Sequence, residues 1–190
     1  MNKNKFTCLV DMDNIMVDMV KTWLLRYNEI KGTNCILDDI KDYDVGKLCT
    51  DTETLYAILD EEGFFYNLDP IPGAVEYFQK LVDEGYDMVV VTQPPRRADR
   101  AIYDKRRWMK KYFPNFDSSN IVYCHRKDII RGDILFDDRP SHLADWKNMN
   151  PSGITATLLY RYNRDCLCDW KFPLKTGWKE FYDAITKNLR

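Results

Sequence analysis

The chain has no long apolar stretch, and this shortage excludes whole classes of protein. No window stays apolar for the ~18 residues that a membrane-spanning helix requires. The apolar stretch near the N-terminus meets Asp11 and Asp13 within a few positions, which differs from the uninterrupted core of a secretory signal. We therefore expect a soluble, cytoplasmic protein with no membrane partner.

The net charge of the chain is also small. The formal charge is −2 over 190 residues, and acidic and basic residues are interspersed along the chain. A chain of this kind offers no general positive field to hold a nucleic acid or an anionic membrane. Stable nucleic-acid binding is therefore not expected, and any phosphate-binding site must be local.

Cysteine and histidine are present without the spacing that metal sites need. The six cysteines are scattered, and the only close pair, Cys166 and Cys168, has no second pair or histidines at zinc-binding spacing. The only two histidines, His125 and His142, have no ligand-spaced partners. We expect reduced thiols, no zinc, and no functional role for the histidines.

Short apolar, β-leaning segments recur along the chain and predict its fold class. They occupy residues 6–11, 86–92, 120–124, 133–138 and 154–160. Helical periodicity lies between or after them, at residues 72–85, 98–113 and 177–189. Alternation of strand and helix is typical of an α/β protein with a doubly wound parallel sheet, a Rossmann-like core.

Residues 17–70 interrupt this alternation. They offer two helical stretches, about 18–31 and 51–61, and no convincing strand. We interpret 17–70 as a small helical cap inserted after the first strand, with 1–16 and 71–190 forming the core domain. An insertion that leaves the carboxyl edge of a sheet lies over the site there and can select substrates. Residues 161–176 look irregular.

Carboxylates follow two of the predicted strands. Asp11 and Asp13 end the first, and Asp137 and Asp138 end a later one. Four carboxylates at one edge of a sheet repel each other and need a cation, and oxygen ligands suit Mg²⁺ better than zinc. For Asp137 and Asp138, capping of a following helix is the alternative explanation.

Two further groups predict an anion site beside these carboxylates. Thr92 ends the strand at 86–92 with a hydroxyl, and Lys127 lies ten residues before Asp137. A metal, a lysine and a hydroxyl around a carboxylate are what phosphoryl transfer requires, because its catalysis is mostly charge neutralisation and positioning.

With these residues in place, the chain resembles the haloacid dehalogenase superfamily, and within it the 5'(3')-deoxyribonucleotidases. The superfamily pattern is D-x-D, then Thr, then Lys, then Asp-Asp, and all four occur in order. The narrower resemblance lies in three segments: GFFYNLDPIPGAVEY (63–77), DKRRWMKKYF (104–113) and RKDIIRGDILFDDRP (126–140).

The resemblance implies a role for each matching position. Asp11 would be the nucleophile that forms an aspartyl-phosphate, and Asp13 the general acid and base. Mg²⁺ would be held by Asp11, the Asp13 backbone carbonyl and Asp137, with Asp138 as a further ligand or anchor. The phosphate-binding set would be Thr92, Gln93, Lys105 and Lys127.

The resemblance is less complete around the substrate. Asn14 replaces the family's usual glycine, and Met19 replaces an aromatic residue placed against the base. Gln93 stands where the family often has serine. We assign Met19, Phe64, Phe65 and Arg139 to the substrate pocket, although the two phenylalanines fit core packing equally well.

These observations predict a magnesium-dependent phosphohydrolase that acts on nucleoside monophosphates, with a role in deoxyribonucleotide catabolism. One alternative is an enzyme of the same fold acting on another small phosphomonoester or on a polynucleotide 3'-phosphate end. Another is a nucleotide-binding protein without turnover, which the presence of Asp11 and Asp13 disfavours. The resemblance also raises a homodimer as an expectation.

Overall fold

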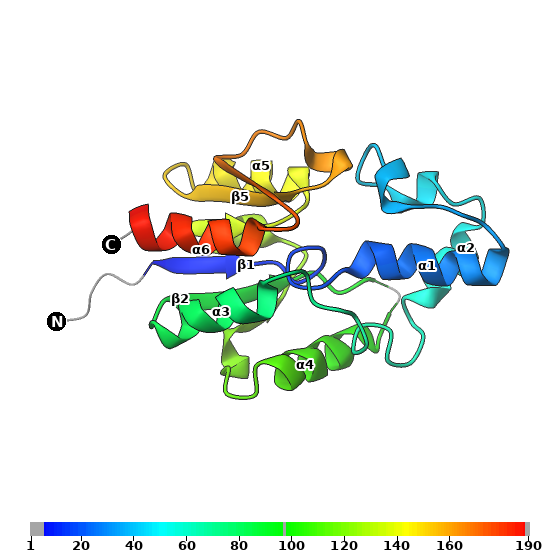
Figure 1. Ribbon diagram of the computed structural model, residues 1–190, viewed down its shortest axis with the longest axis horizontal. Helices are drawn as coiled ribbons and strands as arrows, with labels where there is room; N and C mark the ends of the chain where they lie inside the picture. The colour runs from blue at the N-terminus through cyan, green and yellow to red at the C-terminus, as the bar shows by residue number, and fades with distance from the viewer. Residues whose placement is uncertain (1–5, 97, 189–190) are drawn as a thin grey trace.

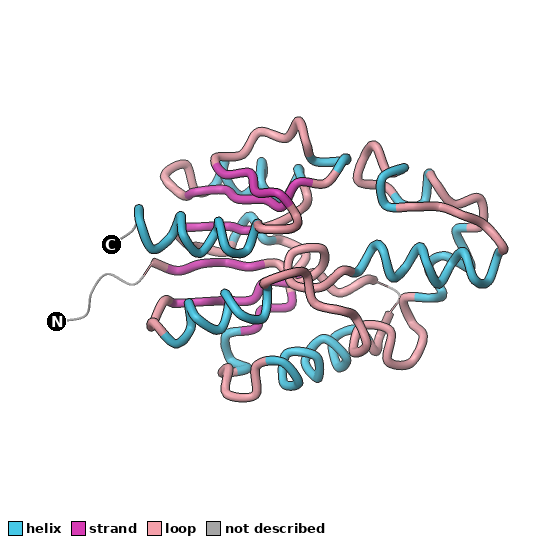
Figure 2. Tube along the Cα trace, viewed as in Figure 1, coloured by secondary structure: helices cyan, strands magenta, loops and turns pink. Residues whose placement is uncertain are grey.

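The computed structural model describes residues 6–96 and 98–188. Six parallel strands form one sheet in the order β3-β2-β1-β4-β5-β6 (Figures 1 and 2). The strands are β1 (Thr7–Val10), β2 (Asp87–Thr92), β3 (Ile121–Tyr123), β4 (Ile134–Phe136), β5 (Ile154–Leu159) and β6 (Trp170–Pro173). The α/β class with a doubly wound parallel sheet is confirmed.

Both faces of the sheet are buried. Along β1, Cys8 and Val10 belong to one apolar cluster and Leu9 to a second. Successive side chains of a strand point to opposite faces, so this alternation shows that helices cover each side. The larger cluster includes α3 (Ala74–Asp83) and α6 (Gly177–Asn188), and the smaller one includes α5 (Pro140–Met149).

The larger cluster is rich in aromatic rings. Phe136 of β4 stacks on Phe181 of α6 with ring centres 4.2 Å apart, and Trp178 contacts both. The other core helix, α4 (Ala101–Tyr112), is fixed through Trp108, whose indole N–H donates to the backbone oxygen of Leu68 at 2.8 Å. Helices are thus present within the predicted ranges 72–85, 98–113 and 177–189, of which residue 189 lies outside the described residues. Gly85, at φ 83°, follows α3, as its sequence indicated.

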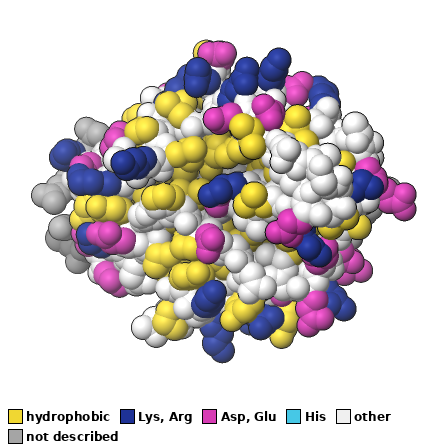
Figure 3. All heavy atoms as spheres, turned by 45° about the vertical axis from the view of Figure 1, so that its right-hand side comes forward, with side chains coloured by type: hydrophobic (Ala, Val, Ile, Leu, Met, Phe, Trp, Pro, Cys, Tyr) yellow, Lys and Arg dark blue, Asp and Glu magenta, His cyan; other side chains and the backbone are white. Residues whose placement is uncertain are grey.

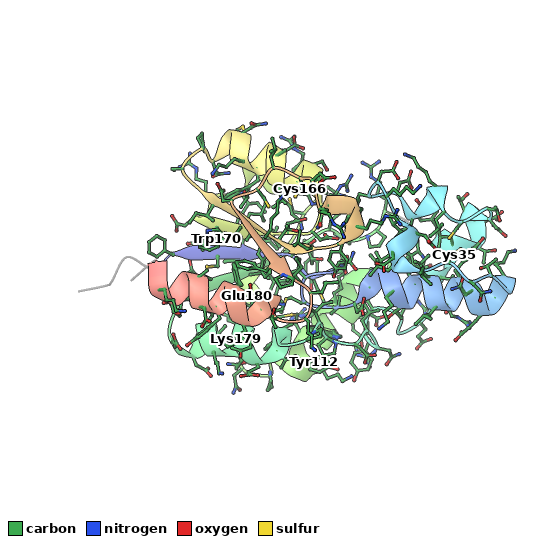
Figure 4. The ribbon with its side chains drawn as sticks, turned by 45° about the horizontal axis from the view of Figure 1, so that its top comes forward. Cys35, Tyr112, Cys166, Trp170, Lys179 and Glu180 are labelled. Carbon is green, nitrogen blue, oxygen red and sulfur yellow. The ribbon has the colours of Figure 1, made fainter. Side chains whose placement is uncertain are left out.

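Residues 161–176, which the sequence analysis read as irregular, contain regular structure. They hold the 3₁₀ turn η5 (Arg161–Asn163) and the edge strand β6, which pairs with β5. Between them lie Cys166 and Cys168, with sulfur atoms 3.8 Å apart, while Cys35 lies well away among the helices after β1 (Figure 4). The prediction of irregular structure for this segment was wrong, because the four residues of β6, which end in Pro173, show no sequence pattern typical of a strand.

The residues between β1 and α3 hold α1 (Met19–Lys31), α2 (Thr52–Ile58) and the short turns η1 (Leu37–Asp39) and η2 (Val45–Lys47). We call residues 17–70 the helical segment. It lies beyond the carboxyl ends of the strands (Figure 1). Its two ends run side by side: Asp18 N–H donates to the Asp69 oxygen and Ile71 N–H to the Met16 oxygen, both at 2.9 Å.

In the parts of the chain that the structure describes, no helix combines the length and apolarity needed to cross a membrane. On the face that Figure 3 shows, basic and acidic side chains are mixed with apolar ones. No field of one sign covers that face, in keeping with the small net charge.

Candidate active site

The candidate site forms where β2, β1 and β4 end side by side. Asp11 directly follows β1, Asp137 and Asp138 follow β4, and Thr92 is the last residue of β2. All three strands are parallel neighbours, so their carboxyl ends meet at one edge of the sheet. All four side chains are buried, with exposed fractions of 5% or less.

Lys127 occupies the centre of this group. Its ammonium lies 2.7 Å from Asp11 Oδ1 and 2.7 Å from Asp137 Oδ2, and the side chain is 1% exposed. The turn η4 (Lys127–Ile129), between β3 and β4, delivers it to the site. A buried cation held between two carboxylates attracts both and keeps them close, although its single positive charge offsets only one of their two negative charges.

A second ion pair lies beside the first. Lys105, completely buried on α4, places its ammonium 2.6 Å from Asp13 Oδ2 and 2.7 Å from Thr92 Oγ1. The structure thus brings Lys105 to the site, rather than leaving it on the solvent-facing side of a basic helix. Of the neighbouring cationic residues, Arg106, Arg107, Lys110 and Lys111 are exposed.

Carboxylate oxygens of Asp11, Asp137 and Asp138 lie within 4.8 Å of one another, as the ligands of a single cation would. Among the described residues, Asp13 Oδ1 and Asp138 Oδ1 are the buried side-chain oxygens without a hydrogen-bond partner. Such an orphaned acceptor is costly unless a cation or water satisfies it. The cluster therefore fits a hard metal ion, whereas the Asp13 carboxylate is engaged by Lys105.

The backbone conformation and the hydrogen bonds of Asn14 explain why asparagine can replace the family's usual glycine at this position. Its φ of 55° lies in the left-handed region, and among the residues described it is the one non-glycine with positive φ. Its side chain also bonds in two directions: the amide donates to Asp138 Oδ2 at 2.9 Å, and its oxygen accepts from Val20 N–H at 3.0 Å. Glycine could make the turn but neither of these bonds.

Burial, together with the neighbouring charges, shifts the pKa values of the carboxylates. Burial raises the pKa of Asp11 to about 6, although Lys127 opposes the shift. Burial, followed by the charge of Asp137, raises the pKa of Asp138 well above its ordinary value. Burial would also raise the pKa of Asp137, but Lys127 and His142 hold it below its usual range. The raised pKa values of Asp11 and Asp138 show that their negative charges are unfavourable without a cation or a proton, so the site favours cation binding.

The shift of Asp11 predicts how stability depends on pH in metal-free protein. Its folded pKa of about 6 exceeds the ordinary value of 3.8, so between these values the folded state binds more protons than the unfolded state. Its contribution to stability is complete below 3.8 and is lost as the pH rises through 6. The expected slope is at most about 1.4 kcal/mol per pH unit.

Urea unfolding in chelator across pH 4–7 would measure this effect. In Asp11→Asn the contribution of this group should disappear. Plots of unfolding free energy against pH for wild type and Asp11→Asn should therefore differ in slope below pH 6. Parallel curves would show that Asp11 titrates normally in the folded protein.

A cavity of about 500 Å³ opens beside Asp11 and Asp13. Three of the residues assigned to phosphate or substrate, Gln93, Met19 and Arg139, line it. Phe64 and Phe65 are not among the lining residues; both are buried, and the Phe65 ring lies 5.0 Å from the Lys105 ammonium. Phe64 packs edge-on against Phe65, with ring centres 5.1 Å apart. The helical segment supplies most of the remaining wall: Val20, Trp23, Ile40, Tyr43, Asp44, Val45 and Tyr56.

Sequence reasoning missed several contacts of the site. His142, given no role, places Nδ1 3.1 Å from Asp137 Oδ2 and lines the cavity. Tyr162 donates its hydroxyl to Asp138 Oδ2 at 2.5 Å, and Asn163 donates to the Asp138 backbone oxygen at 2.9 Å. The position of His142, four residues after Asp138 and in the first turn of α5, was the only signal available for any of them.

Comparison with protein families and solved structures identifies relatives of this chain. Residues 5–189 match the family described as 5' nucleotidase, deoxy (pyrimidine), cytosolic type C protein. The 5'(3')-deoxyribonucleotidase of Clostridium acetobutylicum is 32% identical over 146 residues, which are 76% of this chain and 79% of that protein. The Bacillus subtilis 5'(3')-deoxyribonucleotidase is 30% identical over 140 residues, 74% of this chain and 80% of that protein.

The fold has a solved counterpart in a haloacid dehalogenase family hydrolase from Deinococcus radiodurans, described with bound phosphate and sodium. The TM-score is 0.65 at 11% identity, with 98% of this chain and 97% of that chain covered. This structural similarity shows the fold alone. The family is shown by the sequence match, which extends over residues 5–189. The chain therefore belongs to the 5'(3')-deoxyribonucleotidase family, whose members are phosphoric monoester hydrolases, and it has the fold of haloacid dehalogenase family hydrolases.

Proposed function

We propose that this hydrolase is a magnesium-dependent 5'(3')-deoxyribonucleotidase that removes phosphate from deoxyribonucleoside monophosphates through an aspartyl-phosphate. The observation that carries the proposal is the position of Asp11. It lies within ion-pair distance of Lys127, inside a three-carboxylate cluster, and on the wall of a cavity of about 500 Å³. A nucleophile, a phosphate-binding cation and a metal site are thus adjacent to room for a small substrate.

Asp11, Asp137 and Asp138 are the residues that would hold Mg²⁺, because their oxygens form the cluster and Asp138 Oδ1 is unpartnered within the described chain. The family resemblance adds the backbone carbonyl of Asp13. When bound, the metal would neutralise charge on the phosphate and on these carboxylates. Lys127, between Asp11 and Asp137, would supply a second positive charge to the phosphate oxygens.

The side chains can divide the reaction into two displacements. An Asp11 carboxylate oxygen attacks phosphorus, the phosphate ester bond breaks, and the leaving nucleoside oxygen takes a proton from Asp13. Asp13 then removes a proton from water, which attacks phosphorus, releases inorganic phosphate and frees Asp11. Lys105 holds Asp13 and Thr92 in place at 2.6 Å and 2.7 Å, beside the expected phosphate position.

The remaining walls of the cavity suit a nucleoside. Apolar and aromatic side chains of the helical segment, including Met19, Trp23, Val45 and Tyr56, face a cavity whose other wall carries Asp11, Asp13 and Gln93. An apolar half for a base and a polar half for a phosphate are typical of small-molecule sites. We propose that residues 17–70 act as a cap over the core formed by residues 1–16 and 71–190.

The decisive experiment is phosphate release from a matched panel of substrates. It would contain ribo- and deoxyribonucleoside 5'- and 3'-monophosphates, sugar phosphates and an oligonucleotide with a 3'-phosphate end, each with Mg²⁺ and with chelator. We expect fast, Mg²⁺-dependent hydrolysis of dUMP or dTMP over ribonucleotides and sugars. Hydrolysis of only the sugar phosphates or only the oligonucleotide would contradict the proposal that deoxyribonucleoside monophosphates are the substrates. Absence of hydrolysis of every compound would contradict the proposed catalytic role.

A further inference from the structure

The turn that follows β5 contacts both the carboxylate cluster and the helical segment. It consists of Tyr160–Asn163, including η5, and was not predicted to take part in the site. Tyr160, Tyr162 and Asn163 are buried, with exposed fractions of 8% or less. The rings of Tyr160 and Tyr162 stack at 5.1 Å with an angle of 7° between their planes. This packing gives the turn a defined conformation.

On the core side, Tyr162 fixes Asp138. Its hydroxyl donates to Asp138 Oδ2 at 2.5 Å, and the amide of Asn14 donates to the same oxygen at 2.9 Å. Both donors therefore act on Oδ2 and leave Oδ1 as the unpartnered oxygen. Hydrogen bonds of this kind orient a metal-binding carboxylate and usually change metal affinity 10- to 100-fold.

On the side facing away from the core, the same turn contacts the helical segment. The ring of Tyr43 meets the ring of Tyr162 edge-on, with centres 5.3 Å apart, and the Arg139 guanidinium lies 5.0 Å from the Tyr43 ring centre. Arg161 donates to the backbone oxygen of Asp38 at 2.6 Å. Residues 37–48, which carry Tyr43, are thus docked on the turn that holds Asp138.

We propose that Tyr162 is a positioning residue that couples cation binding at Asp138 to docking of residues 37–48, its hydroxyl orienting the carboxylate and its ring receiving Tyr43. The inference rests on the metal role assigned to Asp138 in the proposed function. Coupling of this kind is reciprocal: if the cation favours the docked segment, docking favours the cation by the same factor. Residues 37–48 line the cavity through Ile40, Tyr43, Asp44 and Val45, so metal binding at Asp138 would also order this wall of the cavity.

Calorimetric titration of Mg²⁺ into substrate-free protein tests the orienting role without measuring activity. Tyr162→Phe keeps the ring and removes only the hydroxyl, and we expect Mg²⁺ affinity to fall about 10-fold or more. Tyr160→Phe is the matched control, because its hydroxyl donates to the Asn14 backbone oxygen at 2.7 Å and not to a carboxylate. Its Mg²⁺ affinity should stay within about twofold of wild type.

Hydrogen exchange in residues 37–48 tests the coupling. In the wild type, Mg²⁺ should slow exchange there; in Tyr162→Phe, saturating Mg²⁺ should leave it unchanged, although the ring contact with Tyr43 is retained. Tyr43→Leu should abolish the protection and weaken Mg²⁺ binding less than Tyr162→Phe does.

Three results would overturn the inference: wild-type affinity in Tyr162→Phe, an equal loss in Tyr160→Phe, or the same Mg²⁺-induced protection in Tyr162→Phe as in wild type. Failure of the wild type itself to bind Mg²⁺ would be distinguishable, since it would remove the metal role in the proposed function as well.

Discussion

Replacing Asp11 by asparagine is expected to lower kcat/KM for the best nucleotide substrate by at least about 10⁴-fold while leaving the fold in place. Losses of this size are typical when a nucleophile is removed from a covalent mechanism. The fold should survive because Asp11 Oδ1 accepts hydrogen bonds that an amide oxygen can also accept, from Met12 N–H at 2.8 Å and from Lys127 at 2.7 Å. What asparagine lacks is a carboxylate oxygen able to attack phosphorus.

Rapid acid quench with ³²P-labelled substrate would connect this loss to the mechanism. Wild type should yield a hydroxylamine-sensitive phosphoprotein, and Asp11→Asn should yield none. Asp183→Asn, at an exposed ion pair with Lys179 on α6, is the control and should keep both the intermediate and the rate. Turnover of Asp11→Asn near that of the control would exclude the covalent route, whatever the substrate.

The fold could be predicted from the sequence where the periodic pattern was strong. β1, β2 and β5 are short apolar runs buried on both faces, and the run lengths and intervening helices were sufficient to predict a parallel sheet. The sequence signal was weaker for α5, since only Leu143 and Trp146 along its ten residues are buried apolar side chains. For β6 it was absent, because pairing with β5, rather than local preference, forms that strand.

The chemical residues were predictable for a different reason. Asp11, Thr92, Asp137 and Asp138 each stand at or just after the carboxyl end of a predicted strand, and parallel topology alone brings these ends together. Lys105 is mid-helix, and only the family resemblance distinguished it from the basic residues around it. Its burial beside Asp13 is a tertiary property.

The supporting residues could not be predicted because their roles depend on contacts between distant segments. Tyr162 reaches Asp138 from 24 positions away, and Tyr160 reaches Asn14 from 146 positions away. A tyrosine in a short turn belongs to no periodic sequence pattern. The acceptor of its hydroxyl is determined by the tertiary structure alone. The coupling inference depends on one of these contacts, the hydrogen bond from Tyr162 to Asp138.

Lys127→Met is expected to have the second largest effect and to act on stability as well as on catalysis. The ammonium is the cation shared by Asp11 and Asp137, and its removal leaves two buried carboxylates at van der Waals distance from an apolar side chain. Breaking one partner of a buried ion pair costs about 3–5 kcal/mol. Loss of a charge that stabilises the transferring phosphoryl group should lower kcat by about 10²- to 10³-fold.

Urea unfolding with chelator and with Mg²⁺ separates these two effects. The stability loss should be largest in chelator and should shrink with Mg²⁺, because a bound cation neutralises the carboxylates in place of the lysine, whereas the loss in kcat should remain. Lys147→Met is the matched control, since Lys147 pairs with Asp169 at 3.0 Å on the surface, where such pairs contribute up to about 1 kcal/mol. Equal destabilisation of both variants in chelator would mean that the carboxylates are neutralised by their own protons. The ion pairs at Lys127 would then not be what holds the metal-free site together.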